Sequence, residues 1–180
     1  MAYGDSFKQF ILDNNIPVNL IEPIGPSATN PIIFLNSIIV DELIRNSFAV
    51  HVPNGGLIIG KFHAEGGIHM LQPFDKGFQY VGEMEGYEFL FSAKATKNHW
   101  DRINALNKSI PYIEDITPKP FKIPRHIKKI ELWKLGFQII VLPSEPHYIL
   151  KRSATAKYLE LIDEMNDDRK MKNLLRLFGL

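Results

Sequence analysis

The stretch HAEGGIHMLQPFDKGFQYVGEMEGYEFLFSAKAT, residues 63–96, concentrates side chains that could bind a metal ion or transfer protons. A metal site needs three or four ligands that converge on one point. Four residues of neighbouring expected strands could meet in this way, but no recurring ligand spacing such as His-Glu-x-x-His connects them. We therefore expect surface or rim histidines, no bound metal and no cofactor. The four residues are His51, His63, Glu65 and His69.

Four hydroxyl side chains, Ser92, Thr96, Ser153 and Thr155, lie where an expected strand passes into an expected helix. A nucleophilic hydroxyl needs a neighbouring base and a third group that orients the base. At the start of a helix, a hydroxyl commonly accepts a hydrogen bond from a free backbone N–H. We interpret all four residues as helix caps and expect no catalytic residue. The chain has no cysteine, which excludes disulfides, cysteine zinc sites and thiol catalysis.

The one local concentration of charge is TPKPFKIPRHIKK, residues 117–129. Its basic residues Lys119, Lys122, Arg125 and Lys128 recur at every third position. Polyproline II has three residues per turn, and the prolines of this segment favour it. An extended segment would then present one basic edge, which could follow a phosphate backbone or an acidic protein surface. A solvated, semi-rigid linker is the alternative interpretation.

The spacing of apolar residues along the chain predicts that these side chains lie on short strands and helices. Apolar runs separated by glycine-rich turns are typical of strands, and apolar residues three and four apart indicate amphipathic helices. Ser37 is the candidate cap of the second helix. The expected strands cover residues 57–62, 67–71, 78–82, 87–91, 136–142 and 148–151, with a partly alternating stretch at 127–135, and the expected helices cover residues 5–14, 37–45, 96–107, 153–166 and 167–178.

The chain also contains an internal repeat. KGFQYVGEMEGYEFLFSAKATKNHWDRINALN, which begins at Lys76, aligns without a gap with LGFQIIVLPSEPHYILKRSATAKYLELIDEMN, which begins at Leu135, a shift of about 59 residues. The ungapped register indicates a duplicated strand–turn–strand–helix unit, in which Trp100 and Leu159 take equivalent core positions. The acidic residues Glu83, Glu85 and Glu88 have no acidic counterpart in the second copy, so we interpret them as turn or solvent-facing residues.

Composition narrows the class of protein. The 180 residues suffice for one domain or two small ones, and a net charge of +1 excludes a global field that draws the chain to nucleic acid or membrane. The N-terminal residues lack the basic leader and apolar run of a secretory signal. The longest apolar stretches are too short to span a bilayer. We expect a soluble protein made inside a cell, without a membrane partner.

Three short motifs resemble a pattern of virion and prophage structural proteins of phages that infect Bacteroidetes, the crAss-like phages among them. That pattern has a Ser-His-x-x-Gly-Gly-Ile element, a Glu-Gly-Gly-Glu element and a helix start with Lys, Ala and Thr. Here Phe62 stands in place of the serine and Tyr87 in place of the second glycine. The resemblance covers roughly residues 57–107 and implies a structural role in a phage particle, without a catalytic residue. The matching residues are His63, Gly66, Gly67, Ile68, Glu85, Gly86, Glu88, Lys94, Ala95 and Thr96.

Together these observations predict an α+β fold on an antiparallel sheet, with two duplicated β-hairpin–helix units and short N-terminal and C-terminal helices. Residues 1–50 would form N-terminal helices and an irregular arm. Residues 51–107 would form the first unit. Residues 108–126 would be a proline-rich basic connection, and residues 127–180 the second unit with the C-terminal helix.

The predicted function is that of a non-enzymatic subunit of a neck, connector or tail ring, made in the host cytoplasm and incorporated into the virion. Its partners would be copies of itself and neighbouring virion proteins, and its basic segment could contact DNA. Two alternatives remain: a small metal-dependent hydrolase centred on His51, His63 and His69, and a nucleic-acid-binding module using Lys119–Lys129. The expected contact residues are Lys119, Lys122, Arg125, Lys128, Met171, Leu174, Leu175 and Phe178.

Overall fold

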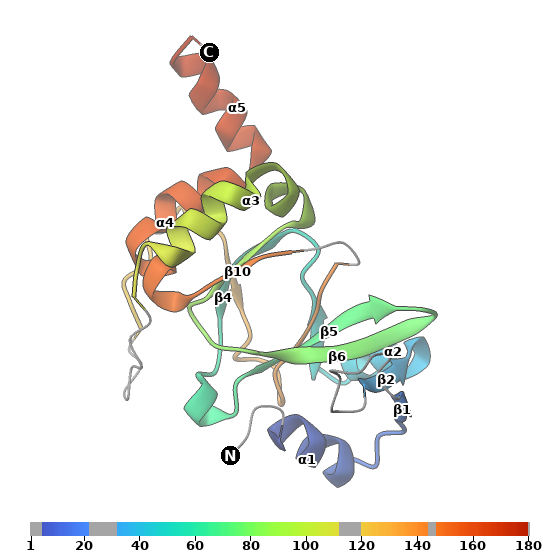
Figure 1. The fold of residues 1–180 in the computed structure, drawn as a ribbon. Coiled ribbons are helices and arrows are strands. Elements are labelled where there is room, and N and C mark those ends of the chain that lie inside the picture. The colour runs from blue at the N-terminus through green and yellow to red at the C-terminus, as the bar shows by residue number, and fades with distance from the viewer. Residues whose placement is uncertain (1–4, 22–31, 112–119, 144–146, 180) are drawn as a thin grey trace. The chain divides into compact units, whose positions relative to one another are not determined.

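The computed structural model describes residues 5–21, 32–111, 120–143 and 147–179 (Figure 1). The chain forms two compact units, and each is assembled from separate stretches of sequence. Unit 1 combines Met1–Val52, Lys61–Met84 and Trp133–Ser144, and unit 2 combines Pro53–Gly60, Glu85–Leu132 and Glu145–Leu180. This grouping differs from the four consecutive segments expected from the sequence, because strands distant in the chain pair with one another.

Unit 1 is a six-stranded sheet with helices α1 (Asp5–Asp13) and α2 (Ser37–Arg45). Apolar residues of both helices pack with strand residues into one core, which includes Phe7, Val40 and Leu71. The one-turn 3-10 helix η1 (His63–Glu65) precedes β5. The strand order is β1 (Asn19–Ile21), β2 (Ile32–Asn36), β6 (Gly77–Met84), β5 (Ile68–Phe74), β9 (Ile139–Val141) and β3 (Ala49–His51).

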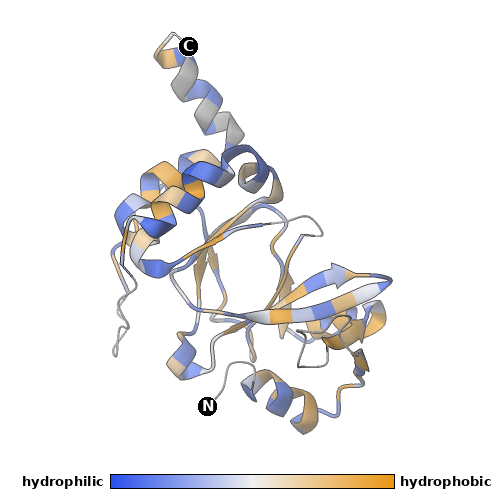
Figure 2. Cartoon of the chain, viewed as in Figure 1, coloured by the Kyte–Doolittle hydropathy of each residue, from blue (hydrophilic) through white to orange (hydrophobic). Residues whose placement is uncertain are grey.

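Unit 2 is a four-stranded sheet against which helices α3 (Ala93–Lys108) and α4 (Arg152–Asn166) pack side by side (Figure 1). Figure 2 shows apolar and polar residues alternating along α3 and α4, as expected for helices with one buried face. Helix α5 (Asp168–Leu177) follows and extends away from this helix pair. The strand order is β10 (Ile149–Leu150), β7 (Phe89–Phe91), β4 (Gly55–Ile59) and β8 (Lys129–Glu131).

The α+β class is confirmed, but the single antiparallel sheet is wrong. The described strands form two sheets, and the pairs β3–β9, β5–β9 and β4–β8 are parallel. The two strands of each repeat do not form a hairpin either. In the first copy, β6 pairs with β2 and β5, whereas β7 pairs with β4 and β10; in the second copy, β9 pairs with β3 and β5, whereas β10 pairs with β7. A sequence pattern indicates that a segment is a strand, whereas its pairing depends on which other strands the folded chain brings beside it.

The second strand and the helix of each repeat make equivalent contacts within unit 2. In the antiparallel β7–β10 ladder, Leu90 pairs with Ile149, which is its own counterpart in the repeat. The helices also share an irregularity, because His99 in α3 and its counterpart Tyr158 in α4 both depart from helical geometry, with φ of −129° and −115°. These features indicate a local two-fold symmetry whose axis passes between Leu90 and Ile149.

Two asparagines tie the repeats together in a reciprocal way. The Ser92 N–H donates to Asn166 Oδ1 at 2.7 Å, and its counterpart, the Lys151 N–H, donates to Asn107 Oδ1 at 3.1 Å. Each asparagine lies near the end of one helix and accepts a bond from the residue that precedes the other helix. The exchange satisfies a backbone donor at each helix start, where no intrahelical acceptor is available.

We expect Asn166→Ala to lower the free energy of unfolding by about 1–3 kcal/mol. The substitution removes the acceptor for the Ser92 N–H and the bond from Asn166 Nδ2 to Asn54 O, which is 2.9 Å long. Urea unfolding monitored by circular dichroism measures the change. Asn98→Ala is the matched control, because Asn98 lies exposed on α3. Equal stabilities of the two variants would contradict a role for the reciprocal pair.

Trp100 and Leu159 differ in burial, although the sequence predicts equivalent core positions. Leu159 is 6% exposed and belongs to the core of unit 2, whereas Trp100 is 50% exposed. The prediction is correct for Leu159 and wrong for Trp100. An amphipathic stripe indicates which side of a helix faces the sheet, but it does not indicate whether another segment covers the edge of that side.

We expect Trp100→Ala to reduce stability by less than about 1 kcal/mol, because half of the indole is already in water. Leu159→Ala should cost about 2 kcal/mol or more, because it empties a buried position. Chemical denaturation of the two variants side by side provides the comparison. A loss of several kcal/mol for Trp100→Ala would mean that the indole is buried in solution.

Candidate functional site

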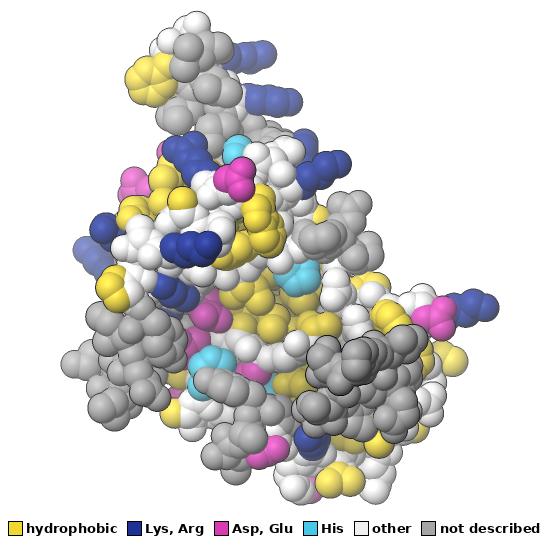
Figure 3. Space-filling view, in the orientation of Figure 1, with side chains coloured by type: hydrophobic (Ala, Val, Ile, Leu, Met, Phe, Trp, Pro, Cys, Tyr) yellow, Lys and Arg dark blue, Asp and Glu magenta, His cyan; other side chains and the backbone are white. Residues whose placement is uncertain are grey.

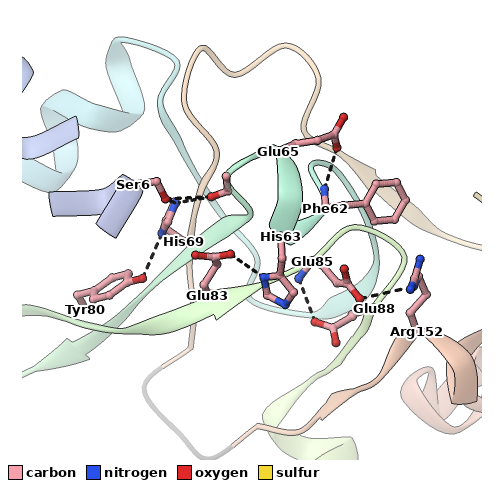
Figure 4. A network of polar contacts seen from close by, with 11 residues as sticks. Ser6, Phe62, His63, Glu65, His69, Tyr80, Glu83, Glu85, Glu88 and Arg152 are labelled. Atoms are coloured by element: carbon pink, nitrogen blue, oxygen red, sulfur yellow. Dashed lines mark hydrogen bonds and ion pairs between the residues drawn. The ribbon is translucent and has the colours of Figure 1, made fainter. Parts of the chain in front are cut away.

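The first motif, in unit 1, forms a closed turn around η1 (Figure 4). The Glu65 carboxylate accepts the Phe62 N–H at 2.9 Å, and the N–H groups of Gly66 and Gly67 donate to the carbonyls of His63 and Phe62 at 3.0 Å each. Gly66 and Gly67 both have positive φ, at 103° and 67°. The Gly-Gly pair is therefore required by a reversal of the backbone.

An ion pair between His63 and Glu83 supports this turn. His63 Nδ1 lies 2.6 Å from Glu83 Oε1, and the Glu83 side chain is only 6% exposed. A Cβ atom at Gly67 would approach Glu83 Oε1 to 2.2 Å, so the carboxylate occupies the space that a side chain would need. The interpretation of Glu83 as a turn or solvent-facing residue is therefore wrong. The repeat alignment could not reveal its role, because His63 lies outside the duplicated segment.

His69 is fully buried in unit 1, so its interpretation as a surface histidine is wrong. Its Nε2 lies 2.9 Å from the Gly66 carbonyl and 3.1 Å from Ser6 Oγ, and its Nδ1 lies 3.2 Å from Tyr80 Oη. Because the carbonyl can only accept, Nε2 carries the proton and Nδ1 accepts from the Tyr80 hydroxyl. The neutral imidazole therefore has a partner at each nitrogen (Figure 4).

The surroundings of His69 favour this neutral form. Burial lowers the pKa of His69; the charge of Glu83 opposes the shift, and Lys61 and His63 reinforce it. Burial also raises the pKa of Tyr80, so its hydroxyl remains a donor. The Phe137 ring stacks on the imidazole with a centroid distance of 4.8 Å. His69 can thus neither bind a metal nor act as a base without losing its network.

His51 lies exposed on β3, at an edge of the sheet. Within the described part of the chain, no group of three or more His, Cys, Asp or Glu residues is placed to hold a metal ion. The residues proposed as a hydrolase centre therefore serve different structural roles: His51 is a surface residue, His63 pairs with Glu83, and His69 belongs to the buried network.

The second motif, Glu85-Gly86-Tyr87-Glu88, forms a turn in unit 2. The Glu85 N–H donates to Glu88 Oε2 at 3.1 Å, and Glu85 Oε1 lies 3.5 Å from Arg152 Nε (Figure 4). The prediction of turn residues is confirmed for Glu85 and Glu88. Tyr87 has φ of 69°, a conformation that favours glycine. This is the position at which the phage pattern has its second glycine.

The four hydroxyl residues differ in their roles. Ser92 caps α3, because its Oγ accepts the Ala95 N–H at 3.1 Å. Thr96 and Thr155 are buried inside their helices: Thr96 Oγ1 accepts the Tyr148 N–H at 3.0 Å, and Thr155 Oγ1 donates to the Leu150 carbonyl at 3.1 Å. Capping is thus confirmed for Ser92 and wrong for the two threonines, which tie helices to strands. Ser153 is half-buried at the start of α4.

A side-chain amide also caps α2, because Asn36 Oδ1 accepts the Ile39 N–H at 3.0 Å. The sequence predicted Ser37 for this role, and Ser37 Oγ instead donates to the Lys76 carbonyl at 3.0 Å. Asn and Ser are equally good caps, so the pattern alone could not decide between adjacent residues.

The basic segment is anchored to unit 2. Lys122, Arg125 and Lys128 are exposed, whereas Lys119 lies outside the described residues. A turn in which the Ile127 N–H bonds the Pro124 carbonyl at 3.2 Å interrupts the expected continuous basic edge. Apolar side chains hold the segment, so a fully solvated linker is also wrong for its described part. The anchoring residues are Phe121, Ile123 and Ile127.

Lys128 contributes to a hollow of about 660 Å³ in unit 2, which we call the lysine hollow. Lys94, at the start of α3, and Lys170, on α5, also line it. Lys170 forms an ion pair with Asp163, whose side chain is buried beneath the hollow's surface. Of these three lysines, the sequence predicted only Lys128 as a contact residue. The other two lie in distant segments and approach it only in the folded chain.

The C-terminal segment forms the expected helix, α5. The side chains of Met171, Leu174 and Leu175 lie outside the described residues. Phe178 follows the helix and is 72% exposed, and the neighbouring Leu177, which the sequence reasoning did not single out, is 82% exposed. Two large apolar side chains thus reach water next to each other.

The polar residues of these two motifs are therefore engaged in turns. Among the described residues, the lysine hollow and the apolar end of α5 are surface features that these turns do not use. Among the described residues, no helix combines the length and the apolar character needed to cross a bilayer. Comparison with known proteins finds no match to this chain among family models, curated proteins or solved structures.

Proposed function

We propose that this chain is a non-catalytic structural subunit of a bacteriophage virion, placed in a ring of the neck, connector or tail. It binds copies of itself and neighbouring virion proteins. One observation carries the proposal: the residues that resemble the phage pattern act as turn closures and helix starts. A pattern of this kind specifies a fold, and it is compatible with a subunit whose function is assembly.

Individual positions of the pattern support this interpretation. A Cβ atom at Gly86 would approach the Gly60 carbonyl oxygen to 2.1 Å, so only glycine fits there. Ala95 and Thr96 are both buried in the first turn of α3, and Thr96 Oγ1 accepts the Tyr148 N–H there. Tyr87 departs from the pattern but adopts a positive φ, so the turn has a backbone geometry that a glycine at this position would favour.

Helix α5 is the candidate assembly contact. It extends away from α3 and α4 and ends in the exposed Leu177 and Phe178. A terminal helix is usually ordered only when it docks against something, and permanent interfaces typically bury more than about 2,000 Å² in total. Lys122 and Arg125 provide exposed polar contacts in the same unit.

The test is the mass of the protein in solution, measured by sedimentation for the full chain and for a chain lacking residues 168–180. We expect a ring-sized oligomer from the full chain and smaller species from the truncated one, with circular dichroism and unfolding showing that the truncated chain remains folded. A Lys172→Ala variant, changed at an exposed position of α5, serves as the control. A monomeric full chain at high concentration that is also missing from purified particles would contradict the proposal.

The lysine hollow favours a second candidate, contact with a nucleic-acid backbone, because Lys94 and Lys128, from distant segments, line it beside the Lys170–Asp163 ion pair. If the hollow holds phosphate, Lys128→Ala and Lys94→Ala should each weaken DNA binding and reduce the salt dependence of log Kd by about one unit. Lys157→Ala, on the exposed part of α4, should not. Fluorescence anisotropy with a labelled duplex at several salt concentrations measures both effects. Binding that is equally weak for all three variants and the parent chain would exclude this candidate.

A further inference from the structure

The local two-fold symmetry of unit 2 relates two pairs of side chains, and the two pairs differ strongly in their exposure to solvent. Phe89 and Leu159 form one pair, and their counterparts in the repeat are Tyr148 and Trp100. Phe89 is fully buried and Leu159 nearly so. Trp100 packs edge-on against Tyr148, with ring centroids 5.2 Å apart at 75°, and half of its surface is exposed.

The chain itself covers the Phe89–Leu159 side with residues 120–127. Phe121 contacts the Tyr87 ring edge-on at 5.1 Å, next to the strand that carries Phe89. His126 Nε2 lies 3.8 Å from Glu160 Oε1, next to Leu159 on α4. This covering segment forms neither helix nor strand over residues 121–124 and includes two prolines, Pro120 and Pro124. It thus combines proline, apolar and basic residues.

On the Trp100–Tyr148 side, half of the Trp100 surface is exposed. The counterpart of Glu160 is Asp101, which is exposed beside Trp100 on α3. Figure 3 shows hydrophobic side chains at the surface over the α3–α4 helices, among charged groups. Exposed tryptophan and tyrosine edges form the grooves in which other proteins bind proline-rich segments, since a polyproline II chain loses little entropy when it docks. A carboxylate at the rim favours a basic residue in the partner.

We propose that the Trp100–Tyr148 face binds an extended, proline-containing segment of a partner protein, with a basic residue of that segment facing Asp101. The partner is a different protein, because in the described part of each copy the proline-containing segment that covers such a face, residues 120–127, is already engaged on its own Phe89–Leu159 side. The inference deepens the proposed assembly role by naming the chemistry of one partner. It does not depend on α5.

The experiment uses the full chain with Trp133→Phe, so that Trp100 is the only tryptophan of the two in the sequence. The probe is a synthetic peptide, PFKIPRHIK, with the sequence of residues 120–128, because it has the chemistry that covers the equivalent face. We expect a saturable change in tryptophan fluorescence on titration. Asp101→Lys should weaken binding at least fivefold, and so should a peptide in which both prolines are alanine. Arg102→Ala, exposed on the same helix, should leave binding unchanged.

Three outcomes would overturn the inference. One is no saturable signal at millimolar peptide. The second is binding that neither Asp101→Lys nor the loss of proline affects. The third is a change in Trp100 fluorescence with the concentration of the chain alone, which would identify a second copy as the occupant. A peptide that does not bind, while removal of residues 168–180 still dissociates the oligomer, is a distinct result. That result would contradict the binding of a proline-containing segment and leave the proposed assembly role supported.

Discussion

Gly86→Ala is expected to lower the free energy of unfolding by about 3 kcal/mol or to prevent unit 2 from folding. The new Cβ would lie 2.1 Å from the Gly60 carbonyl oxygen and 2.8 Å from its carbonyl carbon. Both atoms belong to the backbone, so no side-chain rotation can relieve the overlap. The turn at Gly86 lies beside β4, and the Tyr87 N–H donates to the Ile58 carbonyl there at 2.7 Å. Moving the turn away would break this bond.

Chemical denaturation monitored by circular dichroism measures the effect. Gly136→Ala is the matched control, because Gly136 also has an ordinary φ, but its new Cβ would meet only the side chain of Phe48 at 3.1 Å. A ring can shift by a few tenths of an ångström, so this substitution should cost far less. If Gly86→Ala were as stable as Gly136→Ala, the close approach of the two backbone segments would not exist in solution.

Replacing the buried imidazole is the second change with a large expected effect. We expect His69→Ala to cost about 3–5 kcal/mol, since it leaves a cavity next to Phe137 and removes one hydrogen-bond partner each from the Gly66 carbonyl, Ser6 Oγ and Tyr80 Oη. His51→Ala, at an exposed position, should change stability by less than about 0.5 kcal/mol. Similar losses for the two variants would show that His69 is not buried.

The same histidine gives the stability of the chain a defined pH dependence. The pKa of His69 in the folded protein lies below its ordinary value of about 6.5. Below that pH, the unfolded chain therefore binds a proton that the folded chain resists, and stability falls as the pH decreases. The contribution of His69 is complete above about pH 6.5 and is lost progressively below it, by at most about 1.4 kcal/mol per pH unit.

His69→Gln tests this sign, because glutamine does not titrate. Unfolding free energies measured at several values between about pH 7.5 and pH 5 should fall more steeply for the parent chain than for the variant. The carboxylates contribute to both proteins mainly at lower pH, so they largely cancel in the difference. A parent chain with the same or a shallower slope would mean that His69 is free to protonate in the folded state.

Several parts of the fold were predictable because they depend on neighbours in sequence. Helix α2 spans the predicted residues, and α4 and α5 agree within a residue or so at each end, because apolar spacing and helix starts are local signals. The repeat also predicted which residues of α3 and α4 correspond. The reciprocal bonds of Asn107 and Asn166 occur at matching positions of the two copies.

The pairing of the strands and the burial of surface side chains by other segments were not predictable, since both depend on segments distant in the chain. Nothing in the sequence of β6 and β7 indicates that they join different sheets, and the parallel pairing of β5 with β9 joins residues about 70 positions apart. The same holds for the lysine hollow, where Lys94, Lys128 and Lys170 meet only after folding.

The sequence by itself determined the α+β class, the helices, the repeat and the glycines of the two motifs, because periodicity, capping and turn chemistry act between near neighbours. Only the tertiary structure decided what the polar residues do. Glu83 and His69 are buried because partners from η1, β6 and α1 satisfy them, and burial without such partners would be too unfavourable. Trp100 remains half-exposed, while Leu159 is buried, because among the described residues only the face of Leu159 has a covering segment, residues 120–127.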